Sequence, residues 1–241
     1  EINVMNQTKP MPKLAAALAF LASLLLIVSL LFTALQLVMH DETWFAARYE
    51  AYGTAGEIGI PTKDITAALM QLIDYMEGDV ASIDLTVMEN GIPVSMYNER
   101  ETLHMIDVRE LYQAWRSVRD FGVPAAALLL LGACALLPKG ARLRTLSKGY
   151  LRASVFFGAI VAALGIWVAV DFNSFWINFH YLFFDNDLWI LSYRTDRMIR
   201  ICPQQLFYDI VVKFGLIFLT AFGALLAAAI VGSRNRKRGA R

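Results

Sequence analysis

Four long apolar stretches alternate with polar regions along the chain. They cover residues 14–39, 121–137, 154–170 and 210–232. A helix needs ~20 predominantly apolar residues to cross the hydrocarbon core of a bilayer. The pattern therefore predicts four transmembrane helices, of which the second is short for a span. The first is too long for the core of a signal peptide and no small-residue cleavage site follows it, so we expect an uncleaved anchor.

The charged residues predict how these spans are oriented. Residues 138–153 and 233–241 each carry five Lys or Arg and no acid, and residues 1–13 carry two lysines. With four spans, these three regions lie on one side of the membrane, and the positive-inside rule makes that side cytoplasmic. Residues 40–120, with fifteen Asp or Glu against six Lys or Arg, then face outwards together with residues 171–209. Both termini are expected in the cytoplasm.

The outer segment 40–120 is long enough to fold, and its first half predicts a helix and a hairpin. Apolar residues keep a helical period from Pro61 to a stop at Gly78. Apolar residues then alternate with polar ones on both sides of Asn90-Gly91, a dipeptide that favours a tight type I′ turn. An isolated hairpin is marginally stable, so we expect it to pack on a helix or on the membrane surface.

A second helix is predicted after the hairpin, from about residue 99 to 118. Asn98, with Glu101 three residues later, resembles a capping box. A helix starting there aligns His104 on one stripe with apolar residues as far as Trp115. The fold class that follows is a mostly α membrane protein with four transmembrane helices and a small extracytoplasmic α/β subdomain (helix, β-hairpin, helix) between spans one and two.

Three histidines are candidates for chemistry. His40 ends the first span, and we interpret it as an interfacial residue without a catalytic part. His104 and His180 could each be a buried or interfacial histidine when taken alone; His180 lies in an aromatic-rich run typical of a membrane–water interface. The predicted topology puts both on the outer side, beside apolar surface and near acidic residues. Histidine suits proton transfer near neutral pH, so a pair of them at a lipid surface indicates chemistry on a lipid ester.

Other kinds of site are poorly supported by the sequence. It contains no H-E-x-x-H, G-x-S-x-G or P-loop motif. Glu101 and His104 have the spacing of a carboxylate-bridged metal bundle, but no second copy exists, and we expect neither metal nor cofactor. Cys134 and Cys202 are interpreted as small buried hydrophobic residues. The basic tail has no interleaved aromatic residues, so no nucleic-acid partner is expected, and the spans carry no chain of charges typical of a transporter.

Two motifs resemble a known family, the bacterial lipoprotein intramolecular transacylases (Lit). The first motif surrounds His104, the second surrounds His180, and the four-span layout with a large first outer loop also agrees. The matching residues are Asn98-Glu99-Arg100-Glu101, His104-Met105 and Asp107-Val108-Arg109, then Phe179-His180, Phe183-Phe184, Asn186-Asp187-Leu188-Trp189 and Arg194-Thr195-Asp196-Arg197. The resemblance covers nearly the whole chain.

The resemblance implies an activity and a substrate. Such enzymes move the sn-2 acyl chain of a diacylglyceryl-modified lipoprotein onto the free α-amine of its N-terminal cysteine, which leaves an N-acyl lyso-lipoprotein. The implied partners are this lipoprotein and membrane lipids, and the implied location is the bacterial plasma membrane with the site on the outer face. The family's two essential histidines fall on His104 and His180.

Supporting roles are assigned to nearby polar residues. Glu101 or Asp107 is expected to orient His104, which would favour His104 as the base. Arg100, Asp187 or Arg197 could support the oxyanion or the partner histidine, although a structural role is favoured for each of the three. Trp189 joins this group of supporting or substrate-binding residues. Two other functions stay open, a non-catalytic membrane scaffold or accessory protein and a metal-dependent lipid hydrolase.

Overall fold

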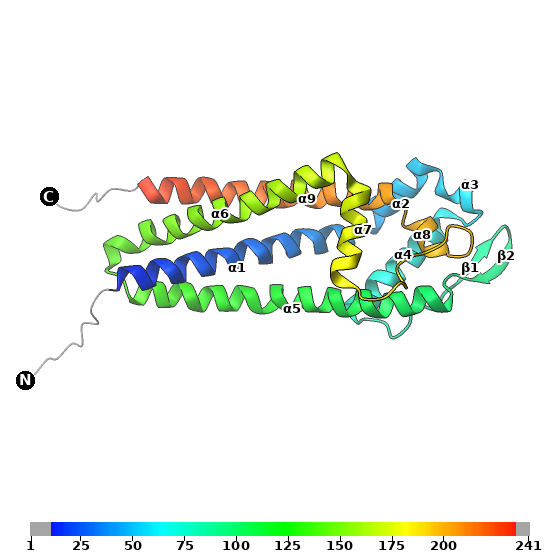
Figure 1. Ribbon diagram of the computed structural model, residues 1–241, viewed down its shortest axis with the longest axis horizontal. Coiled ribbons are helices and arrows are strands. Elements are labelled where there is room, and N and C mark those ends of the chain that lie inside the picture. Colours follow the sequence, from blue (N-terminus) through cyan, green and yellow to red (C-terminus); the bar gives the residue numbers. More distant parts are fainter. Residues whose placement is uncertain (1–10, 235–241) are drawn as a thin grey trace, which may run out of the picture. The chain divides into compact units, whose positions relative to one another are not determined.

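The computed structural model describes residues 11–234, and most of them belong to helices. The predictions for residues 1–10 and 235–241, which belong to the expected cytoplasmic N-terminus and tail, lie outside the described residues. The elements in chain order are α1 (Pro12–Met39), α2 (Glu42–Tyr52), α3 (Thr54–Ile58), α4 (Thr62–Glu77), β1 (Thr86–Glu89), β2 (Ile92–Ser95), α5 (Glu99–Ala135), α6 (Lys139–Val170), α7 (Phe172–Phe183), α8 (Arg197–Ile201) and α9 (Gln204–Arg234) (Figure 1).

Within residues 11–234, four helices are long and apolar enough to cross a membrane, which confirms the predicted fold class. They are α1, α5, α6 and α9. By contacts within the chain, the structure divides into two compact units. The described part of the first unit consists of residues 11–33, 117–166 and 216–234. The second unit consists of residues 34–116 and 167–215.

Small residues let the helices of the first unit approach one another closely. A buried cluster at the start of α1 and the end of α5 contains Ala15, Ala19, Ala133 and Leu137. A Cβ built on Gly149 of α6 would come within 2.8 Å of Ala19, so this contact requires glycine. Apolar side chains gain little by leaving lipid, and close packing of small residues is therefore a main source of helix association in a membrane.

The predicted helix 99–118 and the predicted second span are one helix, α5, and not two. The helix runs through Pro124 without interruption. Proline removes one backbone donor, but a membrane helix tolerates this where neighbouring groups satisfy the freed carbonyl. Asp120, Gly122 and Pro124 at the junction are residue types that favour turns, yet α5 continues through all three from its charged first part into its apolar second part.

The polar regions next to the spans hold more helix than the sequence predicted. The segment 138–153, expected as a basic loop, is helical from Lys139 as the first part of α6. The aromatic segment 171–209, also expected as a loop, contains α7, α8 and the start of α9. The pair α2 and α3 was not predicted either. Lys and Arg are good helix formers, so a run of basic residues does not by itself mark a loop.

The second unit contains the predicted helix and hairpin. α4 ends at Gly78, whose φ of 89° is the left-handed conformation that favours glycine at a helix end. β1 and β2 pair antiparallel with Val87 opposite Val94. Asn90 and Gly91 between them have φ values of 53° and 80°, as a type I′ turn requires. Both predictions are confirmed.

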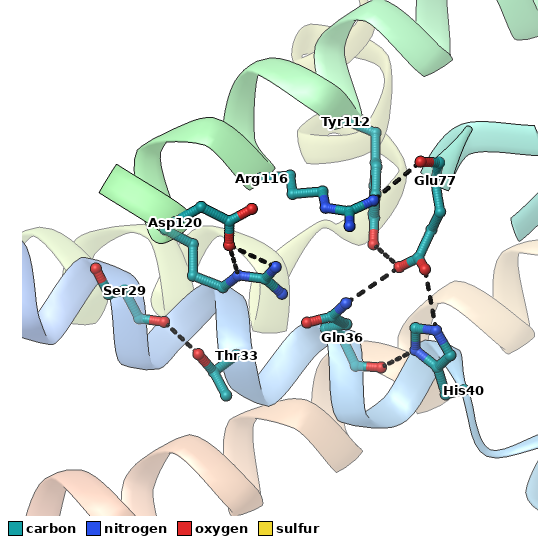
Figure 2. A network of polar contacts seen from close by, with 9 residues as sticks. Ser29, Thr33, Gln36, His40, Glu77, Tyr112, Arg116 and Asp120 are labelled. Atoms are coloured by element: carbon teal, nitrogen blue, oxygen red, sulfur yellow. Dashed lines mark hydrogen bonds and ion pairs between the residues drawn. The ribbon is translucent and has the colours of Figure 1, made fainter. Parts of the chain in front are cut away.

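Glu77, at the end of α4, joins three helices of the second unit (Figure 2). Its carboxylate accepts hydrogen bonds from the Tyr112 hydroxyl at 2.5 Å, the Gln36 amide at 3.3 Å and the His40 ring at 3.1 Å. Its backbone carbonyl accepts from Arg116 at 2.9 Å. His40 therefore takes part in a contact between α1 and α4, and the prediction that it has no catalytic part stays a prediction.

Candidate active site

His104 lies in the charged first part of α5, more than four turns before the apolar stretch that begins at residue 121. The predicted capping box fixes the start of this helix. The Asn98 backbone N–H donates to the Glu101 carboxylate at 2.8 Å, and the Glu101 N–H donates to the Asn98 side-chain oxygen at 3.0 Å. This reciprocal pair satisfies two donors that a helix start would otherwise leave free, and it holds the turn that carries His104.

His180 lies one turn before the end of α7. The N-cap residue Asp171 starts this helix by accepting a hydrogen bond from the Ser174 N–H at 2.9 Å. The His180 Nδ1 atom is 2.7 Å from the Trp176 carbonyl oxygen. A carbonyl only accepts, so Nδ1 carries the hydrogen, and in the neutral ring Nε2 keeps a lone pair. The helix thereby leaves one defined ring nitrogen available as a base.

The structure brings the two histidines together. The ring centroids of His104 and His180 are 6.3 Å apart and their planes are tilted by 32°. Both residues are buried, with 7% and 6% of their surface exposed. Phe184 contacts both rings at 5.4 and 5.7 Å, and Trp189 lies 4.8 Å from His180. Two imidazoles at this separation, with aromatic rings around them, can flank one small reacting group.

Burial sets the protonation state of this pair. It lowers the pKa of His104 to about 4, with the charge of His180 acting in the same direction and Asp107 acting against it. Burial also lowers the pKa of His180, and the hydrogen bond to the Trp176 carbonyl opposes this shift. An uncharged ring is favoured because an apolar environment penalises the charged form. Both histidines are therefore neutral near pH 7.

The carboxylate oxygens of Glu101 bind backbone groups, and the buried Nδ1 atom of His104 has no hydrogen-bond partner, so the expectation that Glu101 orients this histidine stays a prediction. Its carboxylate is 1% exposed and accepts from the backbone N–H of Asn98 and, at 2.5 Å, from that of Met198 in α8. The side chain was expected to point along the helix towards His104, but capping its own helix and binding α8 uses both of its oxygens. Asp107 is near enough to affect the pKa of His104, and its Oδ2 accepts from Asn186 at 2.8 Å.

The other predicted supporting residues fall into two groups. Arg100 binds Asp187 through the backbone carbonyl and the carboxylate, which ties α5 to the loop after α7. Trp189 contacts His180, as described. Arg197, by contrast, donates to Glu89 at 2.6 Å and to a backbone carbonyl of the hairpin, which gives it a structural role in joining α8 to β1 and β2.

Three residues make contacts at the site that were not predicted from the sequence. Trp176 supplies the carbonyl that fixes the His180 tautomer, Phe184 contacts both histidines, and Asn186 binds Asp107. The position of Trp176 four residues before His180 was a usable signal once a helix was assigned there. The contacts of Phe184 and Asn186 join α5 to the segment after α7, and spacing along the chain does not encode them.

One cavity of the second unit lies away from the two histidines in the chain. A shallow cavity is lined by Phe172, Gln204, Gln205 and Tyr208, at the starts of α7 and α9, and neither histidine lines it. Between residues 11 and 234, no group of three or more His, Cys, Asp or Glu side chains is arranged to hold a metal ion. The expectation of no metal or cofactor stays a prediction.

Comparison with known proteins agrees with the motifs. The family model described as "Lipoprotein intramolecular transacylase Lit" matches residues 20–207. A solved structure of the membrane integral lipoprotein intramolecular transacylase Lit from Bacillus cereus superposes with a TM-score of 0.69 at 14% identity, covering 92% of this chain and 94% of the other. The same Bacillus cereus protein with one histidine replaced by arginine gives a TM-score of 0.69 at 16% identity, covering 91% and 92%. At these identities the likeness shows the shared fold. A search of curated protein sequences finds no match.

Proposed function

The chain belongs to the lipoprotein intramolecular transacylase family, and from this premise we propose how its two buried histidines carry out the acyl transfer. The substrate is a lipoprotein whose N-terminal cysteine carries a diacylglyceryl group and a free α-amine. The sn-2 acyl chain moves onto that amine, and the product is an N-acyl lyso-lipoprotein. The observation that carries the mechanism is the pair of rings, 6.3 Å apart and buried among aromatic side chains.

The proposed site faces the outer side of the bacterial plasma membrane. The clusters of Lys and Arg in residues 138–153 and 233–241 support cytoplasmic termini by the positive-inside rule. In this topology the charged first part of α5 and the aromatic helix α7 lie on the side where mature lipoproteins are anchored. The exposed apolar side chains of Tyr181 and Leu182 on α7 support contact with membrane lipids.

The transfer needs one proton to move. The neutral α-amine attacks the sn-2 ester carbonyl carbon, a C–N bond forms, and the bond from that carbon to the glyceryl sn-2 oxygen breaks. His180 Nε2 takes the proton that the amine loses and returns it to the leaving sn-2 oxygen. Amine and ester belong to one molecule, so holding them in the reactive geometry supplies much of the rate enhancement.

The environments of the two rings support different roles. His180 has its Nδ1–H fixed on the Trp176 carbonyl, which leaves Nε2 as a base. The pKa of His104 is about 4, so this ring is a weak base and stays neutral, and its N–H donates to the developing oxyanion. We propose this assignment in place of the expectation from sequence that His104 is the base, because the Glu101 carboxylate binds the backbone N–H groups of Asn98 and Met198.

The test measures the N-terminal peptide of a diacylglyceryl lipoprotein by mass spectrometry after expression of each variant in a host without the activity. His180→Gln has no base and is expected to yield no N-acyl lyso product. His104→Gln keeps an N–H donor and is expected to retain weak activity, whereas His104→Ala loses it. The third histidine provides the matched control: His40→Ala keeps full conversion. Conversion by His180→Gln at the level of the parent would refute the mechanism.

The same measurement separates the two alternative functions. A scaffold or accessory protein leaves the lipoprotein forms unchanged whether the chain is present or absent. A metal-dependent hydrolase releases free fatty acid instead of transferring the acyl chain, and a chelator abolishes its activity. The proposal requires conversion without release of fatty acid.

A further inference from the structure

Asn186, in the loop after α7, makes three hydrogen bonds with three different groups. Its side-chain Nδ2 donates to the Asp107 carboxylate at 2.8 Å. Its side-chain Oδ1 accepts from the Leu188 N–H at 3.0 Å, and its backbone carbonyl accepts from the Trp189 indole N–H at 2.9 Å. The two side-chain partners fix which way the amide points, because a carboxylate needs a donor and an N–H needs an acceptor.

Two of these partners lie beside the two histidines. Asp107 follows His104 by three residues, so both lie on the same face of α5. The centroid of the Trp189 ring lies 4.8 Å from that of His180, and the two ring planes are tilted by 30°. Asn186 is thus the residue through which a carboxylate next to one histidine is connected to the aromatic ring that covers the other.

We propose that Asn186 is a positioning residue, which holds Asp107 and Trp189 in place so that His104 and His180 keep their separation and orientation; this inference rests on the function proposed above. The amide is suited to the task because it donates to a carboxylate and accepts from a backbone N–H at the same time. Aspartate at this position keeps the shape and the acceptor but puts a second carboxylate against Asp107. Alanine removes both side-chain bonds.

The pair of positions 107 and 186 allows the contact to be broken and then rebuilt. Asn186→Asp breaks it by replacing the donor with a like charge. Adding Asp107→Asn exchanges the two side chains, so that an amide at 107 can donate to a carboxylate at 186, and the Leu188 N–H still has its acceptor. If positioning is what matters, the exchange restores activity that the single change removes.

The assay follows conversion of a diacylglyceryl lipopeptide by the purified full chain, with kcat and KM measured over a range of pH. Asn186→Asp is expected to lower kcat by ~10- to 100-fold with little change in KM, since a displacement on the order of 1 Å in a site has effects of this size. The exchanged variant is expected to recover most of the lost kcat. Asn173→Asp, an exposed asparagine in the first turn of α7, is the control for one added charge and keeps the kcat of the parent.

The pH dependence gives a signature that a purely structural role lacks. In Asn186→Asp, two facing carboxylates raise each other's pKa, and on acidification one of them takes up a proton and becomes a donor. The kcat of this variant relative to the parent therefore rises as the pH is lowered. Charged or titratable groups close in sequence to this contact are Asp185 and Asp187 of the loop, His180 of α7, and Arg100, Glu101, His104, Arg109 and Glu110 of α5.

Two results overturn the inference. One is a kcat of Asn186→Asp equal to that of the parent across the pH range, and the other is an exchanged variant no more active than the single one. Failure of the proposed function is a separate result. In that case the parent forms no N-acyl lyso product, or His180→Gln remains as active as the parent. If the parent is active and His180→Gln is not, the data on Asn186 bear on the positioning role alone.

Discussion

Replacing Glu101 by alanine is expected to destabilise the protein strongly. The carboxylate is 1% exposed and is the acceptor for two backbone N–H groups, those of Asn98 and Met198. A buried N–H left without an acceptor costs about 1–3 kcal/mol. The bond to Met198 is buried and that to Asn98 is partly buried, so the second loss is smaller. The sum is roughly 2–4 kcal/mol, a large part of a typical folding free energy of ~5–15 kcal/mol.

Burial of the carboxylate itself limits this figure. Desolvation raises the pKa of Glu101, and the two backbone hydrogen bonds counteract only part of the shift. Part of what the hydrogen bonds contribute is therefore offset by the cost of burying the charge. Glu101→Gln keeps the volume of the side chain and removes the cost of burying a charge. However, the amide NH2 group then faces one of the two backbone N–H groups, so two donors oppose each other and that N–H loses its acceptor. Its stability should lie between those of the parent and Glu101→Ala.

Thermal unfolding of the purified chain in detergent measures the effect. For a chain of this size, about 2–4 kcal/mol corresponds to a fall in Tm of roughly 5–15 °C. Glu99→Ala is the matched control, because Glu99 lies in the same first turn and is exposed. Its effect should stay within ~0.5 kcal/mol. If Glu101→Ala unfolds at the same temperature as Glu99→Ala, the reasoning is refuted. Lost activity with unchanged Tm would instead mean that Glu101 acts on the chemistry.

Two further predictions concern pH and the second unit. Burial lowers the pKa of His104 from 6.5 to about 4, so between these pH values the unfolded chain binds more protons than the folded chain. The free energy of unfolding should therefore fall by roughly 3 kcal/mol as the pH falls from about 6.5 to about 4. Chemical denaturation at neutral and acidic pH measures this dependence, which should be weaker in His104→Gln. Glu77→Ala removes the acceptor shared by Tyr112 and His40 and should lower the free energy of unfolding by roughly 2–4 kcal/mol. Thermal unfolding measures this effect against Glu110→Ala, a control at an exposed position of α5. Equal Tm values for the two variants would contradict the prediction.

Local rules were enough to predict much of the fold. The lengths of the apolar stretches predicted four spans, because the thickness of a bilayer sets the length of a helix that crosses it. Asn90-Gly91 predicted the hairpin and Gly78 the end of α4, because each depends on the backbone conformation of one or two residues. The capping box of Asn98 and Glu101 was also local. In each case, the determining interaction lies within a few residues of the sequence signal.

The predictions failed where a local signal was weak or a partner was distant. A helix ending near residue 118 and a separate span beginning at residue 121 were predicted, but α5 runs through both and through Pro124, because in a membrane the surrounding helix outweighs the loss of one hydrogen bond. Glu101 has the spacing to reach His104 on its own helix, yet its carboxylate binds Met198, ninety-seven residues away. The pairing of His104 with His180 was predicted from topology and resemblance, while the contacts that fix their geometry depend on how α7 and its loop pack against α5.

The burial of His104 and His180 also affects the nucleophile. A free α-amine has a pKa of ~8, so in water near pH 7 most of it is an unreactive ammonium. The surroundings that lower the pKa of both imidazoles act in the same direction on any amine that enters between them. A cationic amine would have to lose its hydration without gaining a counter-charge from either neutral ring. Such a site admits the substrate as the free base, and so selects the reactive form of the amine before any bond is made.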